Sequence, residues 1–362
     1  EGLRTELEVE LPHLFALFFQ LIRAFIWIDR TIVGSSEVTQ RYRERIWESI
    51  FTHDMRRYRR TLFDRMAEIP TLITGPSGSG KELVARAIGL SRYIPFDPKR
   101  RRFVRAFDEG FQSVNLSALS ETLLESELFG HQRGSFTGAT ADHQGFFELA
   151  GHLGSVFLDE IGELTLEGQA KLLRILEGHP FLPVGATEEV MVDVRVVAAT
   201  NRDLSEFVRE KKFREDLFYR LSVFELIVPP LRDREDDIPR LINHFLEHFK
   251  GQHGRRNLEL SEEAMTSMKE YPWPGNVRQL RNVIDSAVVM ADDPEITSAD
   301  LGLRDAGVSR LETLRIDEWE KRLIRMALDR CKGSVPEAAK LLGVSRATAY
   351  RKITEYEIER KP

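Results

Sequence analysis

Cysteine is almost absent from these 362 residues, since Cys331 is the only one. A single cysteine excludes an intramolecular disulfide framework and suits a reducing cytosol, so we expect a cytoplasmic protein. The sequence also lacks a signal-peptide pattern and any long internal repeat. It starts with Glu1 instead of methionine, which suggests a fragment of a longer protein.

Neither sign of charge dominates, because 52 Lys and Arg stand against 58 Asp and Glu, for a formal net charge of −6. This acidic balance argues against nonspecific nucleic-acid binding by the whole surface, although a local basic patch could still bind DNA. The length suffices for two or three domains, each with its own core.

Only one hydrophobic run, from Leu11 to Ile28, is nearly long enough to span a bilayer. On a helix, its residues His13, Ala16, Gln20 and Arg23 form one narrow polar stripe, because they recur at spacings of three and four. Charge is costly in lipid, so the stripe favours a packing or signalling helix within the protein over a membrane span.

Five short apolar segments alternate with helical stretches from Thr71 to Pro230. Their sequences are TLITG, FQSVNL, SVFLDE, VRVVAAT and FELIVPP. Such alternation predicts an α/β fold in which helices flank both faces of a parallel sheet. After Pro230 the apolar residues fall at helical spacing, which predicts a small all-helical domain.

The segment LITGPSGSGKE carries the G-x-x-x-x-G-K spacing between a predicted strand and a predicted helix. Glycines let such a loop wrap phosphate with its N–H groups inward, and a lysine neutralises the terminal phosphates. Glu82 replaces the usual Ser or Thr, which leaves open how magnesium is held. The alternative is a glycine-rich turn that binds nothing. The predicted nucleotide-binding residues are Gly75, Pro76, Ser77, Gly78, Ser79, Gly80, Lys81 and Glu82.

An acidic pair, Asp159 and Glu160, ends the predicted strand SVFLDE. Asp159 could hold Mg²⁺ directly or through water, and Glu160 could polarise the water that attacks the γ-phosphate of ATP. The alternative is that both residues cap the next helix.

These motifs together resemble one family. Over roughly residues 32–303 the chain resembles the AAA+ domain of bacterial enhancer-binding proteins, the activators of sigma-54 RNA polymerase. This family commonly has glutamate after the loop lysine, so Glu82 fits it. The resemblance rests on GPSGSGKELVARAIG, LLESELFGHQRGSFTGA, VFLDEIGELTLEGQAKLLRILE, VRVVAATNRDL, FREDLFYRLSVFELIVPPLRDREDDIP and YPWPGNVRQLRNVI.

The resemblance implies further site residues. Asn115 matches the asparagine that restrains the catalytic glutamate, and Asn201 matches the sensor of the γ-phosphate. Arg214 and Arg220 match the pair that reaches the adjacent subunit's site, although each could instead form a surface salt bridge. Arg278 matches the lid arginine that contacts nucleotide within its own subunit.

The segment RGSFTGATAD resembles the loop with which the family contacts sigma-54. Two glycines would supply backbone freedom for the loop to rise, while Phe136 and Thr137 would supply contact. Ser135 stands where the family usually has alanine, and the alternative is that Phe136 is an ordinary core residue. The predicted contact residues are Gly134, Ser135, Phe136, Thr137, Gly138 and Ala139.

The C-terminal segment SVPEAAKLLGVSRATAYRKITEY has two short helical patterns separated by Gly343. We expect Ala338, Ala339, Leu342 and Val344 to pack together in a helix-turn-helix, which resembles the Fis-type domain of many such activators. A helical dimerisation unit is the alternative. The predicted DNA-binding residues are Ser345, Arg346, Thr348, Tyr350, Arg351 and Lys352.

The leading hypothesis is a sigma-54-dependent transcriptional activator that hydrolyses ATP with Mg²⁺. Its implied partners are the sigma-54 RNA polymerase holoenzyme, upstream enhancer DNA and copies of itself, from a dimer to a hexameric ring. The alternatives are an AAA+ remodelling ATPase with another protein target, or a DNA-binding regulator with a vestigial ATPase. Two basic connections near 54–63 and 93–110 have no assigned role. The predicted domains are an N-terminal apolar helix or linker (1–31), an AAA+ α/β subdomain (32–232), a helical lid (233–303), a linker (304–314) and a Fis-type domain (315–362).

Overall fold

The computed structural model of the protein describes residues 2–291, 293–303, 320–321, 323–325, 327–328, 331, 334–356 and 358. The chain divides into two compact units, residues 1–303 and 304–362, which are described separately. The predicted linker 304–314 lies outside the described residues, as do the first five positions of the predicted C-terminal domain.

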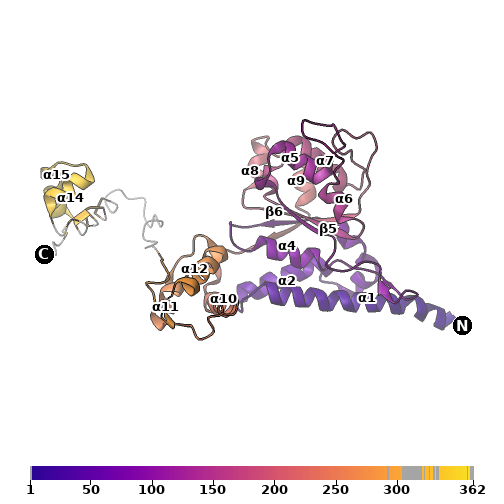
Figure 1. The fold of residues 1–362 in the computed structure, drawn as a ribbon, viewed down its shortest axis with the longest axis horizontal. Coiled ribbons are helices and arrows are strands. Elements are labelled where there is room, and N and C mark those ends of the chain that lie inside the picture. The colour runs from indigo at the N-terminus through magenta and orange to yellow at the C-terminus, as the bar shows by residue number, and fades with distance from the viewer. Residues whose placement is uncertain are drawn as a thin grey trace. The chain divides into compact units, whose positions relative to one another are not determined.

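A five-stranded parallel sheet forms the centre of the first unit (Figure 1). The strands run in the order β4-β5-β6-β1-β7, and each neighbouring pair is parallel. Because the carboxyl ends of parallel strands share one edge, the loops that follow them meet there. All five predicted strands are confirmed: β1 (Thr71–Thr74), β4 (Phe111–Asn115), β5 (Gly154–Asp159), β6 (Val194–Thr200) and β7 (Phe224–Ile227).

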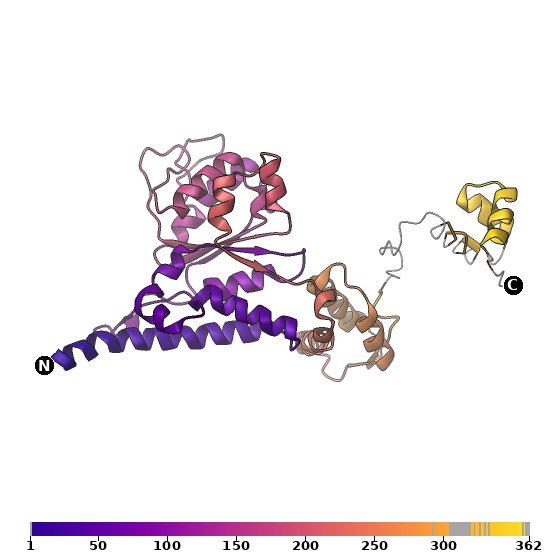
Figure 2. The ribbon, with the colours of Figure 1, turned by 180° about the vertical axis from the view of Figure 1, so that it is seen from behind.

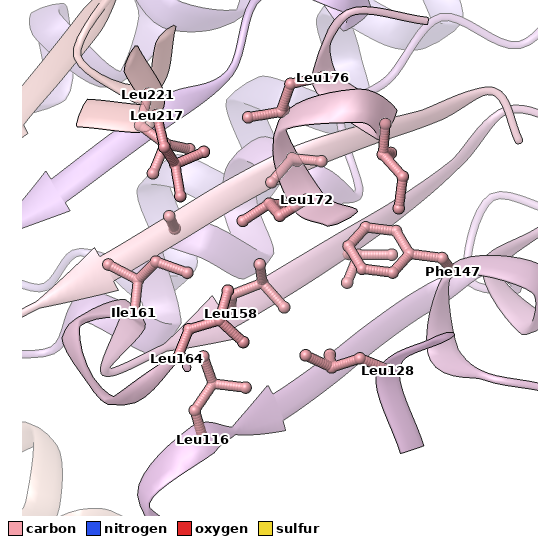
Figure 3. Packing of buried hydrophobic residues seen from close by; sticks show 14 of the residues in the cluster. Leu116, Leu128, Phe147, Leu158, Ile161, Leu164, Leu172, Leu176, Leu217 and Leu221 are labelled. Atoms are coloured by element: carbon pink, nitrogen blue, oxygen red, sulfur yellow. The ribbon is translucent and has the colours of Figure 1, made fainter. Parts of the chain in front are cut away.

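Helices cover both faces of this sheet, as the alternating pattern predicted. Successive strand residues point to opposite faces, so Leu158 packs in one core and Phe157 in the other. Figure 3 shows Leu158 among side chains of the first core, where α7 supplies Leu172. That face carries α5 (Glu121–Phe129), α6 (Phe146–Ala150), α7 (Leu166–Leu176), α8 (Leu204–Arg209) and α9 (Glu215–Leu221), and the other carries α1 (Gly2–Thr31), α2 (Glu37–Phe51) and α4 (Lys81–Gly89).

The polar stripe of α1 faces the protein. Gln20 donates from Nε2 to the Tyr58 hydroxyl and to the Ser91 carbonyl, both at 2.8 Å, and Arg23 donates to the Arg92 carbonyl. This confirms the prediction that the stripe packs within the protein. By length and composition the segment Glu10–Thr31 could still cross a bilayer.

Both basic connections fold into small structures beside α1. The first contains α3 (Met55–Arg57), the π-helix η1 (Tyr58–Leu62) and the 3₁₀ helix η2 (Arg65–Glu68). The second is an antiparallel hairpin of β2 (Phe96–Asp97) and β3 (Arg102–Phe103). Short 3₁₀ turns, η3 (Leu116–Ala118) and η4 (Ile161–Glu163), follow β4 and β5.

The lid begins with η5 (Leu231–Asp237) and continues through three helices around a core that includes Trp273. It is not entirely helical, because β8 (Glu259–Leu260) and β9 (Glu295–Ile296) form a short parallel pair. Two residues are too few to give a periodic signal, so the pattern could not indicate them. The three helices are α10 (Ile238–Gln252), α11 (Glu262–Glu270) and α12 (Asn276–Met290).

The C-terminal unit contains the predicted helix pair, α14 (Val335–Leu342) and α15 (Arg346–Glu355). Gly343 ends α14 with a left-handed φ of 71°, a conformation that glycine adopts at little cost. Ala338 and Ala339 are buried as predicted, but Val344 is exposed, because it lies in the turn and outside the packed face.

Candidate functional site

The glycine-rich loop lies between β1 and α4, as its motif requires. Lys81 is the first residue of α4 and is 7% exposed. Its ammonium donates to the carbonyls of Gly75 at 3.0 Å and Pro76 at 3.5 Å. The positive end of α4 and the lysine thus meet at one point, which suits a phosphate.

The acidic pair stands at the carboxyl end of β5. Asp159 is the last residue of the strand, and Glu160 follows with a left-handed φ of 57°. Burial lowers the pKa of Lys81, and the charges of Glu160 and Asp159 oppose that change. Burial, and then the charge of Glu160, raises the pKa of Asp159. The charge of Glu160 therefore disfavours ionisation of Asp159.

Two asparagines stand at the carboxyl ends of the strands that flank β5, Asn115 as the last residue of β4 and Asn201 directly after β6. The Asn201 backbone N–H donates to Glu160 Oε2 at 3.3 Å. Asn115 lies beside Asp159 in the sheet register, but its side-chain oxygen accepts from the N–H and hydroxyl of Ser117. Restraint of Glu160 by Asn115 thus stays a prediction.

A cavity of about 450 Å³ joins the loop, the acidic pair and the lid. Arg278, from α12, contacts the Ser77 hydroxyl at 3.4 Å through Nη1. This places the predicted lid arginine in the same cavity as Lys81. The cavity is lined by Arg30, Thr31, Ser77, Gly78, Gly80, Lys81, Glu82, Leu83, Asp159, Glu160, His244, Phe245, Val277, Arg278 and Arg281.

The residues of this cavity fit a nucleotide with Mg²⁺. The Lys81 ammonium is held only by backbone carbonyls among the described contacts, so its charge is available to phosphate. Asp159 and Glu160 place two carboxyl groups at the strand end, and burial raises the pKa of Asp159. A divalent cation with oxygen ligands would relieve that cost.

Sequence reasoning missed Asn276, the first residue of α12, which links the phosphate loop to the start of the lid. Its side chain donates to the Ser77 carbonyl at 3.0 Å and accepts from the Leu231 N–H at 2.9 Å. Its backbone φ of 52° is left-handed, and it is 4% exposed. Its position two residues before Arg278 was the available signal.

Asp237 is a second residue that the sequence did not reveal. It accepts from the N–H of Ser35 at 2.6 Å and of Ser36 at 2.7 Å, and from the hydroxyls of Ser36 at 2.8 Å and Thr39 at 2.5 Å. It thereby joins the lid to the start of α2. No local pattern predicts it, because its partners lie about 200 positions away.

The two predicted interface arginines lie outside this cavity's lining among the described residues. Arg214 is paired with Asp216 at 2.7 Å, and Arg220 donates to the Leu176 carbonyl at 2.7 Å. Neither contact involves the nucleotide loop. Their positions are compatible with a role in another subunit, and that role stays a prediction.

The segment Gly134–Ala139 is a folded-back loop. The Gly134 N–H donates to the Ala139 carbonyl at 2.8 Å, and the Ala139 N–H donates to the Phe136 carbonyl at 3.0 Å. The Phe136 ring packs edge-on against His131, with centroids 4.9 Å apart, whereas Thr137 is exposed. In this arrangement Thr137, and not the phenylalanine ring, is the more accessible of the two.

In the C-terminal unit, three predicted DNA-binding residues, Arg346, Tyr350 and Arg351, are exposed on α15. Ser345 caps the helix, accepting from the Thr348 N–H at 3.1 Å. Lys352 is bound to Glu320 at 2.8 Å, and this hydrogen bond raises the pKa of the lysine. Lys352 is thus engaged within the unit.

Three family descriptions match successive parts of the chain. A sigma-54 interaction domain matches residues 51–227, and an AAA+ ATPase lid domain matches 232–307. A bacterial regulatory protein domain of the Fis family matches 315–356. The three matches follow one another along the chain without overlap.

Curated relatives and solved structures agree with these matches. The regulatory protein AtoC of Escherichia coli (strain K12) is 44% identical over 307 residues, 81% of this chain and 64% of AtoC. The DNA-binding transcriptional regulator NtrC of Proteus hauseri is 40% identical over 324 residues, 81% of this chain and 66% of NtrC. The chain thus spans about two fifths to two thirds of the length of the curated relatives it matches.

A crystal structure of NtrX from Brucella abortus in complex with ATP has a TM-score of 0.61 and 32% identity, covering 90% of this chain and 69% of that chain. Another NtrX structure has a TM-score of 0.64 and 30% identity, covering 98% and 74%. The chain belongs to the bacterial enhancer-binding proteins, the sigma-54-dependent regulators that carry an AAA+ domain, a lid and a Fis-type helix-turn-helix.

Proposed function

We propose that this protein activates sigma-54-dependent transcription by coupling ATP hydrolysis to remodelling of the closed RNA polymerase promoter complex. The observation that carries the proposal is the single cavity that joins Lys81, the acidic pair and Arg278. The sigma-54 interaction domain that contains most of it supports the choice of partner. Such a protein acts in the cytoplasm.

Within the cavity, each residue has a distinct task. Lys81 and the loop N–H groups bind the phosphates, and Arg278 from the lid holds the nucleotide from the opposite side. Asp159 is the ligand for Mg²⁺, which would neutralise phosphate charge. Glu160 accepts a proton from the attacking water. Asn201, whose backbone N–H donates to Glu160, is the sensor of the γ-phosphate.

Hydrolysis requires more than one copy of the chain. Arg214 and Arg220 are outside the lining of their own subunit's cavity, and a guanidinium supplied by a neighbour can stabilise charge on the transferring phosphoryl group. Asn115 restrains Glu160 until the neighbour is engaged. We therefore propose a homo-oligomer that closes into a hexameric ring.

The loop Gly134–Ala139 is the proposed contact with sigma-54. Among the described residues, no atom lies within 4 Å of a Cβ placed at Gly134 or Gly138, so both glycines face open space, and we propose that the loop rises there. When it rises, Phe136 would leave His131 and join Thr137 at the tip.

DNA binding is assigned to the C-terminal unit, where exposed Arg346, Tyr350 and Arg351 face outward from α15. Upstream enhancer DNA is the proposed ligand. The Fis-family match supports this assignment.

A transcription assay with purified sigma-54 polymerase, with and without ATP, tests the proposal. We expect open promoter complexes only with ATP and its hydrolysis. ATP hydrolysis without promoter opening at any sigma-54 promoter tested would favour a remodelling ATPase with another target. Promoter binding without hydrolysis would favour a vestigial ATPase.

A further inference from the structure

The outward face of α1 is apolar from Leu11 to Ile26. Six large side chains on this face are exposed, and they follow one another at spacings of four, three, four, three and one. Both ribbon views show α1 along the outer edge of the α/β subdomain, with α2 and α4 on one side of it (Figures 1 and 2). Apolar stripes of this extent mark interaction surfaces. The six exposed side chains of this apolar stripe are Leu11, Phe15, Phe18 (62% exposed), Ile22 (59%), Phe25 (64%) and Ile26.

The opposite face of α1 is fixed to the protein. Gln20 and Arg23 are buried and hydrogen-bonded there, and burial lowers the pKa of Arg23 to about 10. Rotating or extracting the helix would break these bonds. The stripe can therefore be covered only from outside, by something that lies along α1.

The β2–β3 hairpin extends this surface and adds positive charge. The Phe15 ring contacts Phe96, with centroids 4.7 Å apart, and Phe103 at 5.8 Å. Val104 and Phe107 are exposed next to it. The hairpin tip carries Lys99, Arg100, Arg101 and Arg102, all exposed, and among the described ion pairs only Arg100 takes part, with Asp97 at 3.7 Å.

A second copy of α1 is a poor match for this stripe. Helices that pair with one another usually carry charges beside the apolar seam, which set the register and partner. From Leu11 to Ile28 the only Lys, Arg, Asp or Glu is the buried Arg23. The exposed charges at the adjoining hairpin tip are cations, whereas exposed carboxylates stand at the two ends of the stripe, Glu10 and Asp29, and after Phe107, at Asp108 and Glu109. The cationic tip beside the middle of the stripe complements an anionic surface, which needs no register.

We propose that this face docks on an anionic lipid bilayer, with α1 parallel to the membrane plane. The phenylalanine rings would enter the boundary between headgroups and acyl chains, and the hairpin cations would meet anionic headgroups. This is peripheral binding, because the inner face of α1 stays on the protein. The proposal is independent of the proposed transcriptional role.

Flotation of the full 362-residue chain with vesicles tests the proposal. Without nucleotide, the protein is expected to float with phosphatidylglycerol-rich vesicles and not with phosphatidylcholine vesicles, and added salt is expected to weaken binding. Binding that is independent of phosphatidylglycerol, or no binding to either vesicle, overturns the proposal.

Two double variants separate the apolar and charged parts. Phe18→Ser with Phe25→Ser is expected to weaken vesicle binding on the order of tenfold or more. Lys99→Gln with Arg102→Gln should weaken it by about fivefold for each cation. Matched controls on the lid, Met290→Ser and Arg256→Gln with Lys269→Gln, should bind like the parent.

Thermal melting and gel filtration complete the test. The stripe variant should melt at or above the parent's temperature, because it removes exposed apolar groups. A lipid-free dimer that the stripe variant dissociates, together with absent vesicle binding, would identify a second copy as the occupant and overturn the lipid assignment.

Discussion

At the scale of single residues, Gly78 is a point of close approach between the phosphate loop and the lid. A Cβ at this position would lie 2.4 Å from the Gly275 carbonyl oxygen and 3.0 Å from Arg278 Cβ. Gly78 also accepts from the Arg278 N–H at 3.1 Å and has a left-handed φ of 75°. Gly80 shares the left-handed φ, at 105°, but its Cβ would meet nothing closer than 3.9 Å.

This difference makes the two glycines a matched pair. Both Gly78→Ala and Gly80→Ala should cost about 1 kcal/mol for the left-handed backbone. Only Gly78→Ala should also push the lid from the loop, so its Kd for ATP should exceed that of Gly80→Ala by on the order of tenfold. Calorimetric titration measures both affinities. Equal values would mean that the close approach does not matter for binding.

Asp237 should make the protein sensitive to acid. Burial would raise its pKa, but hydrogen bonds from Thr39, Ser36 and Ser35 outweigh burial and lower it. Because the pKa of Asp237 is lower in the folded state than in the unfolded state, its ionised form stabilises the fold. This stabilisation is complete at pH values above the unfolded-state pKa of about 3.9, and it is lost as the pH falls through the folded-state pKa.

We therefore expect Asp237→Asn to lose about 2 kcal/mol of unfolding free energy at pH 7. The difference from the parent should shrink as pH falls through 4, because protonated aspartic acid no longer differs in charge from asparagine. Urea unfolding from pH 7 to 3 measures it. Asp236→Asn, exposed and next in the chain, is the control. A difference that stays constant with pH would contradict the ionic account.

Motif residues could be predicted from the sequence, whereas their long-range partners could not. Lys81 and Asp159 were found because their spacing and strand context are local. Asn276 and Asp237 act through partners about 200 positions away, which only the folded chain brings near. The ion pair between Arg214 and Asp216 could be expected from the sequence, because the two residues are only two positions apart. That Arg214 does not line the described cavity became known only from the structure.

At the scale of elements, a substitution in the loop Gly134–Ala139 can separate the proposed binding to sigma-54 from ATP hydrolysis. Thr137→Ala removes a hydroxyl and a methyl group at an exposed position without changing either glycine. ATP turnover should stay within a few-fold of the parent, a change of about 1 kcal/mol or less in activation free energy. Binding to sigma-54 with a transition-state mimic, and promoter opening, should be lost.

Thr140→Ala, also exposed and just beyond the loop, is the control and should retain sigma-54 binding. If Thr137→Ala loses ATPase activity and sigma-54 binding together, the loop is structural. If it retains both, the proposed tip is wrong.

The helix α15 should carry DNA recognition. Arg346→Ala and Arg351→Ala should each weaken specific binding by about 1–3 kcal/mol where the arginine reads a base, and should reduce the salt dependence where it contacts phosphate. Fluorescence anisotropy against salt distinguishes the two. Lys340→Ala on α14 serves as a control. Equal DNA binding by a chain that ends at Leu303 would contradict the assignment.

Elements with strong local signals were predicted, and short or tertiary ones were not. The five sheet strands are apolar runs beside turn residues, and the helix pair α14 and α15 surrounds a glycine. The pairs β2–β3 and β8–β9 have two residues per strand, too few for a pattern. The polar stripe of α1 predicted which face of the helix packs on the protein. Only the structure revealed that the apolar face opposite to it is exposed.

At the scale of the whole molecule, the proposed active site is incomplete in one chain. Glu160 lies in the cavity, while Arg214 and Arg220 do not belong to its described lining. If a neighbour supplies the arginines, ATP turnover should rise more than linearly with protein concentration. Turnover strictly proportional to concentration, down to dilutions where gel filtration shows monomers, would contradict this.

Mixed oligomers provide the sharper test. Glu160→Gln subunits keep both arginines, and Arg214→Ala subunits keep Glu160, so neither variant alone should hydrolyse ATP. In a random equal mixture, a complete site forms wherever an Arg214→Ala subunit receives its arginine from a Glu160→Gln neighbour. About one quarter of the interfaces meet this condition, so roughly a quarter of parental turnover should return if sites act independently. The control is a subunit that carries both Glu160→Gln and Arg214→Ala. Mixed with Arg214→Ala subunits, it should restore no ATP turnover, because no subunit then supplies Arg214. No recovery at any ratio, with assembly confirmed by gel filtration, would show that Arg214 does not act across the interface.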